Sequence, residues 1–185
     1  MNMEIELCID IDNQIYIDII KELKEEEGFS PTLYLDSLGN YTIGYGTKRN
    51  LYDYEKERLN IKRLLDIVEV SKQEAEYLLI NEVNELIKKF LNLEWFRCKP
   101  GIVQKNLIKL AYNVGFTGTL KFKKMIRNLI TYNFTGAMIE MLDSKHLEQV
   151  KGRNIRYALE IGYLEKISIE NSRKIYEILE YRIGK

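Results

Sequence analysis

The sequence predicts an α+β fold, with a small antiparallel β-sheet lobe and a larger all-helical lobe joined by a long helix. Three observations carry this prediction. Aromatic and β-branched residues at 33–46 flank a Gly-Asn pair, which is typical of a hairpin turn. The sequence SKQE at 71–74 is a capping box that opens an amphipathic stretch reaching about Phe90. Beyond Pro100 the apolar residues recur at helical spacing.

The N-terminal part changes period. Apolar and polar residues alternate over 3–11, which predicts a strand. From Ile15 the apolar spacing is helical, and Asp12 or Asn13 is suited to cap the start of this helix. Gly28 is a natural residue for its end.

The remaining elements follow from local signals. A polar loop is expected over 47–70, before the long helix. We therefore divide the chain into an N-terminal and β lobe at 1–70 and a helical part at 71–185. Within the second part, helices are expected over roughly 101–113, 119–131, 134–142, 152–163 and 167–182.

Composition excludes several protein classes. The 185 residues, 45% of them apolar, can bury one core or two small ones. With only Cys8, Cys98 and His146 as candidate ligands, a zinc site of histidine and cysteine is not expected. The sequence contains no run of about 20 apolar residues, so no membrane span is expected. The acidic N-terminus lacks the features of a secretory signal, so we expect synthesis in the cytoplasm.

A net charge of zero conceals an uneven distribution. Residues 1–36 hold 2 lysines and 10 acidic residues, a net charge of −8, whereas 97–156 hold 12 basic and 3 acidic residues, a net charge of +9. The two regions could attract each other within the fold. Alternatively, the basic region binds an anionic polymer such as cell wall or nucleic acid. No recognised nucleic-acid-binding motif is present.

Three side chains near the predicted hairpin are candidates for acid–base chemistry. Glu27 lies in the last turn of a helix, where partial negative charge disfavours a carboxylate, so it is a candidate general acid. Asp36 and Thr42 fall on adjacent strands and could face one water molecule. Gly44 and Gly46 leave room for a bulky ligand beside them.

These residues carry a family resemblance. EGF at 27–29, YLD at 34–36 and GNYTIGYG at 39–46 resemble the active-site region of the phage-type lysozymes, glycoside hydrolase family 24, which includes the T-even phage lysozyme. The family pattern of Glu-Gly, Asp nine residues later and Thr six residues after that is matched without a gap. The sequences at 71–79 and 112–115 extend the resemblance, which covers roughly 20–165.

The resemblance implies a lysozyme-like fold and assigns roles. Glu27 would protonate the glycosidic oxygen, while Asp36 and Thr42 would hold the attacking water, giving inversion at a carboxyl separation of about 6.5–9.5 Å. Arg153 falls where the family has an arginine paired with the catalytic Glu, with Arg156 as the alternative. The candidate substrate-binding residues are Gly44, Tyr45, Gly46, Asn113, Phe122, His146 and Arg153.

The sequence also departs from the family. Thr47 stands where many members have His, and Glu82 where they often have Asp, so the family's ion pair would become at best a Thr–Glu hydrogen bond. His146 replaces a tryptophan beside the cleft, or is simply a surface polar residue. Tyr45 either stacks on sugar rings or belongs to the core of the small sheet.

The function implied is hydrolysis of the β-1,4 bond between N-acetylmuramic acid and N-acetylglucosamine in peptidoglycan, with no metal or organic cofactor. We expect a monomer that binds a glycan strand, without nucleic acid or stable membrane insertion. It would stay in the host cytoplasm until a holin-type partner or another route releases it to the wall. The alternative is a catalytically silent wall-binding or virion structural module on the same fold.

Overall fold

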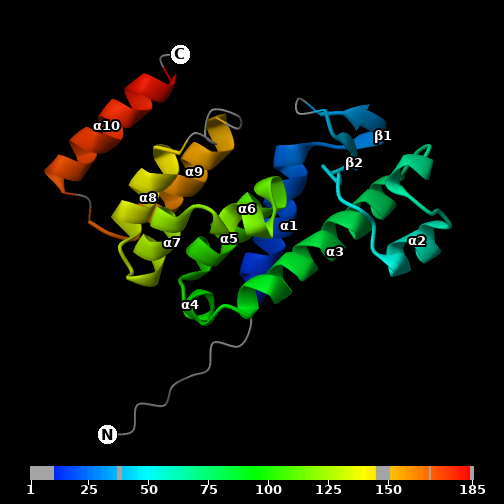
Figure 1. Ribbon diagram of the computed structural model, residues 1–185, viewed down its shortest axis with the longest axis horizontal. Coiled ribbons are helices and arrows are strands. Elements are labelled where there is room, and N and C mark those ends of the chain that lie inside the picture. Colours follow the sequence, from blue (N-terminus) through cyan, green and yellow to red (C-terminus); the bar gives the residue numbers. More distant parts are fainter. Residues whose placement is uncertain (1–10, 37–38, 145–150, 167, 184–185) are drawn as a thin grey trace, which may run out of the picture. The chain divides into compact units, whose positions relative to one another are not determined.

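The computed structural model describes residues 11–36, 39–144, 151–166 and 168–183 (Figure 1). The strand expected over 3–11 falls almost entirely outside these residues. The described elements, in chain order, are α1 (Asn13–Glu27), β1 (Ser30–Leu35), β2 (Tyr41–Gly44), α2 (Asp53–Leu59), the 3₁₀ turn η1 (Leu64–Asp66), α3 (Lys72–Leu91), α4 (Glu94–Arg97), α5 (Gly101–Val114), α6 (Phe116–Leu120), α7 (Lys123–Ile130), α8 (Phe134–Leu142), α9 (Lys151–Gly162) and α10 (Ile169–Ile183).

The chain folds as two compact units. Among the described residues, those within 16–85 form one, here called the sheet unit, and those within 11–15 and 86–183 form the other, the helical unit. The sequence division at 70/71 differs from this one because the first part of α3 packs with the strands. Ala75 of α3 lies against Gly44 at the end of β2. The α+β class predicted from the sequence is confirmed.

Local signals set the start and the end of α1. The Asp12 carboxylate accepts hydrogen bonds from the backbone N–H groups of Gln14 at 2.8 Å and Ile15 at 3.3 Å, so Asp12 is the N-cap. Gly28 follows the helix with φ +68°, and its N–H donates to the Lys24 carbonyl at 3.3 Å. The helix therefore ends at Glu27, as predicted.

The two strands form the expected antiparallel hairpin. Tyr34 pairs with Thr42 and Leu35 with Tyr41, while the register shifts between Ser30 and Tyr34. Beyond β2 the chain turns back on itself, and Thr47 pairs with Ile43 through two backbone hydrogen bonds of 3.0 Å. This compact hairpin holds Asp36 and Thr42 in one small region.

The expectation of a plain loop over 47–70 was wrong. This segment contains α2 and η1. The Glu55 carboxylate accepts the Tyr52 backbone N–H at 2.8 Å and so caps the start of α2. The helix expected over 119–131 is likewise two helices, α6 and α7, separated at Lys121 and Phe122.

The capping box of α3 forms as predicted. Ser71 Oγ accepts the Glu74 backbone N–H at 3.2 Å, and the Glu74 carboxylate accepts the Ser71 N–H at 2.8 Å. In the helical unit, every residue of α5 from Val103 to Tyr112 is buried, and α8 packs against α7, α9 and α10. Among the described helices, none combines the length and apolar composition needed to cross a bilayer.

Candidate active site

Glu27 lies against the turn that follows β2. A Cβ placed on Gly46 would come within 3.1 Å of Glu27 Oε2 and 3.3 Å of its Cγ. Gly46 also has φ +89°, a conformation that L side chains rarely adopt. The positive φ and the close approach of Glu27 therefore both favour glycine at 46, where the lack of a side chain leaves room for the Glu27 carboxyl beside the turn.

Asp36 directly follows β1, and its carboxylate accepts hydrogen bonds from Asn40. Its Oδ1 accepts the backbone N–H of Asn40 at 2.8 Å, and its Oδ2 accepts the Asn40 side-chain amide at 3.1 Å. The Asp36 N–H in turn donates to the Asn40 carbonyl at 2.9 Å. Lys48 Nζ lies 3.9 Å from Asp36 Oδ2. The carboxylate is therefore oriented by neutral donors and faces a cation.

Thr42 lies on β2 and is buried. Its hydroxyl donates to the Asn40 carbonyl at 3.1 Å. Because that bond uses the single hydroxyl proton, the Thr42 oxygen is left as a hydrogen-bond acceptor. A water molecule that meets both Asp36 and Thr42 would therefore donate one hydrogen to each.

Asn40 connects the two predicted water-binding residues. Its carbonyl accepts from Asp36 and Thr42, while its N–H groups donate to the Asp36 carboxylate. From the sequence, Asn40 is expected only to form part of a tight turn. Its position between a candidate Asp and a candidate Thr was the available signal, since Asn in a turn often bonds to nearby backbone and side chains.

The glycines and the tyrosine of the β2 region differ in their surroundings. The side-chain position of Gly44 faces Ala75, where a Cβ would come within 2.8 Å of the Ala75 Cβ. The expectation that Gly44 leaves room for a ligand is therefore wrong: α3 fills that space. Tyr45 is only 7% exposed and packs beside Phe29, with ring centroids 5.5 Å apart. This burial favours the core interpretation of Tyr45 over sugar stacking.

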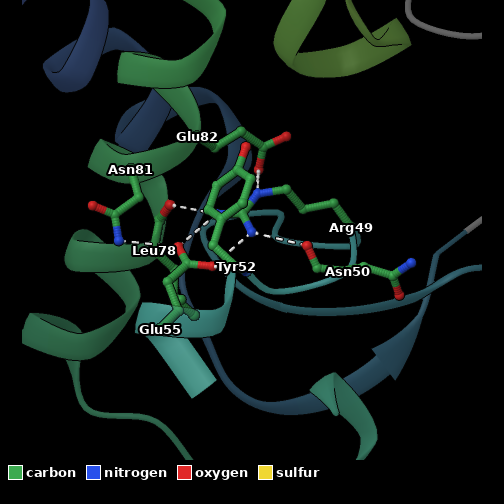
Figure 2. A network of polar contacts seen from close by, with 7 residues as sticks. All are labelled: Arg49, Asn50, Tyr52, Glu55, Leu78, Asn81 and Glu82. Atoms are coloured by element: carbon green, nitrogen blue, oxygen red, sulfur yellow. Dashed lines mark hydrogen bonds and ion pairs between the residues drawn. The ribbon is translucent and has the colours of Figure 1, made fainter. Parts of the chain in front are cut away.

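A polar network lies next to the hairpin in the sheet unit (Figure 2). The Arg49 guanidinium donates to both oxygens of the fully buried Glu55 carboxylate, each at 2.7 Å. It also stacks on the Tyr52 ring, 4.1 Å from the centroid. Asn81 of α3 adds a further donor to Glu55 at 3.0 Å. Arg49 therefore ties the segment after β2 to both α2 and α3.

The expected hydrogen bond between Thr47 and Glu82 is not formed. Thr47 Oγ1 is buried and has no hydrogen-bond partner among the described groups, whereas Glu82 Oε2 lies 3.3 Å from Arg49 Nε. Burial raises the pKa of Glu82 to about 7, although Arg49 and Lys48 oppose this change. Arg49, and not Thr47 as expected from the sequence, therefore contacts Glu82.

The remaining predicted substrate-binding residues lie in the helical unit. The structure brings Asn113 of α5 and Arg153 of α9 together, with Arg153 Nη1 3.4 Å from Asn113 Oδ1. Phe122 lines a hollow of about 310 Å³ with Val114, Gly118 and Lys121. His146 lies outside the described residues. The pairing of Arg153 with Glu27 stays a prediction.

The chain matches a known protein family over residues of both units. The sequence profile of the family described as "Phage lysozyme" matches residues 24–159, a span that includes Glu27, Asp36, Thr42, Asn113 and Arg153. No curated protein sequence matches the chain. Because the match extends over well more than half of the 185 residues, the chain belongs to the phage lysozyme family, which is a family of glycosidases.

Proposed function

We propose that this protein is an endolysin-type muramidase, which hydrolyses the β-1,4 bond between N-acetylmuramic acid and N-acetylglucosamine in bacterial peptidoglycan. The observation that carries the proposal is the pair of hydrogen bonds at Asn40, whose N–H donates to the Asp36 carboxylate and whose carbonyl accepts the Thr42 hydroxyl. These bonds orient a carboxylate and a hydroxyl acceptor on the hairpin that also contacts Glu27. Membership in the phage lysozyme family supports the substrate class.

In the proposed reaction, Glu27 donates its proton to the glycosidic oxygen as the bond to the anomeric carbon breaks. A water molecule donates one hydrogen bond to Asp36 and one to Thr42 Oγ1. Its lone pair then points at the anomeric carbon from the opposite face, and Asp36 takes up the proton that the water releases. The product sugar therefore has the inverted anomeric configuration.

The helical unit would supply contacts to the glycan strand. Asn113 and Arg153 present an amide and a guanidinium close together, which suits the amide and carbonyl groups of N-acetylated sugars. Phe122, which lines its hollow, would supply an aromatic ring for contact with a pyranose ring. Access to the wall from the host cytoplasm would depend on a holin-type partner or another route of release.

The test is clearing of purified cell walls by wild type and Glu27→Gln. Removing the general acid should lower the rate by about 10²–10⁴-fold, since the amide cannot donate a proton to the leaving oxygen. Release of reducing sugar and loss of turbidity measure the rate. Glu25→Gln, an exposed glutamate on the same helix, is the matched control and should keep the wild-type rate.

Two outcomes would contradict the proposal. Equal clearing by wild type and Glu27→Gln would remove Glu27 from the mechanism. Wall binding without clearing by wild type would favour the silent wall-binding module instead.

A further inference from the structure

Lys48 is a charged residue of the hairpin region to which the reaction above assigns no role. It directly follows Thr47, where the chain has turned back beside β2. Its Nζ lies 3.9 Å from Asp36 Oδ2, on the same carboxylate oxygen that accepts the Asn40 amide. Its side chain is 35% exposed, and that of Asp36 is 19% exposed. The pair is therefore partly shielded from solvent.

The backbone on both sides of Lys48 is anchored. On one side, Thr47 makes two backbone hydrogen bonds of 3.0 Å with Ile43. On the other side, Arg49 is held by its two 2.7 Å bonds to Glu55 and by stacking on Tyr52. Because both neighbouring residues are anchored, the backbone of Lys48 is fixed in position. Fewer conformations of its side chain then compete with the one that reaches Asp36.

The neighbouring cation, Arg49, is already paired with two other carboxylates. Arg49 is engaged by Glu55 and Glu82, whose oxygens lie 2.7 Å and 3.3 Å from its nitrogens. Lys48 also acts on Glu82, lowering the pKa that burial raises. Among the described residues, the carboxylates that interact with Lys48 include Asp36 from the end of β1 and Glu82 from α3, and Arg49 lies beside it in the chain. A carboxylate and a cation this close favour each other's charged forms.

We propose that Lys48 is a positioning residue for Asp36, holding its carboxylate ionised and in place to bind the attacking water. Asn40 supplies the neutral donors that orient the carboxylate, and Lys48 supplies the charge. This inference rests on the proposed function, since it gives Lys48 a part in the same reaction.

The first test compares pH profiles of kcat/KM for wild type, Lys48→Met and Lys48→Arg. Losing the cation should move the acidic limb to higher pH by about half a unit to one unit, as expected for a partly exposed pair near 4 Å. Activity on the acidic limb should fall about three- to tenfold, and by less than about twofold at the plateau. Lys48→Arg should restore the wild-type profile. Lys62→Met, which removes an exposed lysine of the same unit, should leave it unchanged.

The second test does not depend on turnover. Carbon-detected NMR follows the titration of the Asp36 carboxyl in the Glu27→Gln background, with and without Lys48→Met. The Asp36 midpoint should rise when Lys48 is replaced and return with Lys48→Arg. Lys48→Gln repeats the measurement with a second neutral side chain, and circular dichroism checks that each variant folds.

The outcomes separate the two proposals. If wild type does not hydrolyse peptidoglycan, the proposed function fails while the NMR titration still decides whether Lys48 holds Asp36 ionised. An unchanged Asp36 midpoint would overturn the inference whatever the activity. A raised midpoint with an unmoved acidic limb would overturn it also, because the pair would then have no effect on the reaction.

Discussion

At the scale of single residues, Thr47 carries a hydroxyl that packing leaves unsatisfied. Its backbone is fully used in the pairing with Ile43, but Oγ1 is buried without a hydrogen-bond partner among the described groups. A buried polar atom without a partner loses its hydration and gains nothing in return. Thr47 therefore weakens the hairpin at the point where the family often has a charged pair.

Replacing Thr47 with Val should increase the free energy of unfolding by about 1 kcal/mol, because the shape is kept and the unsatisfied hydroxyl is removed. Urea denaturation measures the change. The matched control is Thr119→Val, since the buried Thr119 hydroxyl donates to the Gly115 carbonyl at 3.1 Å and its loss should destabilise by about 1 kcal/mol. A destabilised Thr47→Val protein would mean that the Thr47 hydroxyl is satisfied after all.

At the level of secondary-structure elements, the polar network around Arg49 joins the segment after β2 to α2 and α3 (Figure 2). The Glu55 carboxylate has no exposed surface and receives donors from Arg49, the Tyr52 backbone and Asn81. A buried charge is tolerated only when it is paired and hydrogen-bonded in this way. Glu82 completes the network, but it shares Arg49 with Glu55, which already accepts two hydrogen bonds from that arginine. Burial therefore has the largest effect on the pKa of Glu82 and raises it.

Glu82 should make stability depend on pH. Its pKa is about 7 in the folded protein, against an ordinary value of 4.5. Between these values the folded state binds more protons than the unfolded one, so stability should fall as pH rises from about 4.5 to 7. For a carboxylate that is 17% exposed and beside Arg49 we expect a loss of about 2 kcal/mol over this interval.

The measurement is the free energy of unfolding at several pH values for wild type and Glu82→Gln. The amide cannot ionise, so this variant should lose most of the decline between pH 4.5 and 7. Glu69→Gln alters an exposed glutamate of the same unit and should retain the wild-type slope. Parallel curves for wild type and Glu82→Gln would refute the assignment.

At the scale of the whole molecule, charge is separated along the chain. The segment 97–156 carries a net charge of +9 within a neutral protein. Several of its basic side chains are exposed on and just before α7, namely Lys121, Lys123, Lys124 and Arg127. Exposed charges act over about 10 Å at 0.1 M salt. They can attract an anionic wall polymer at low ionic strength only.

Wall binding should therefore weaken with salt. Using Glu27→Gln, so that the wall is not digested, we expect binding to purified walls to fall about tenfold or more between about 0.05 M and 0.5 M salt. Co-sedimentation measures the bound fraction. Walls stripped of anionic polymers provide the control and should bind with little salt dependence. Binding to intact walls that is insensitive to salt would argue against this role of the basic segment.

Much of the site could be predicted because its signals are local. Asp12 and Gly28 set the ends of α1 through contacts within four residues, and the Ser71–Glu74 capping box spans only three. Asp36, Asn40 and Thr42 likewise lie within six residues of one another in the chain. Spacing along the sequence is then a reliable guide to spacing in the fold.

Local signals in the sequence were sufficient to predict the α+β class, the hairpin, the main helices of the chain and the candidate Glu, Asp and Thr. Three features became visible in the folded chain alone: Arg49 contacts Glu82 in place of Thr47, α3 fills the space beside Gly44, and α2 forms within the expected loop. These features depend on contacts between residues 26 to 33 positions apart, namely Asn81 with Glu55, Gly44 with Ala75 and Arg49 with Glu82. Periodicity and capping signals act within a few helical turns, whereas these long-range contacts depend on how whole helices and strands pack.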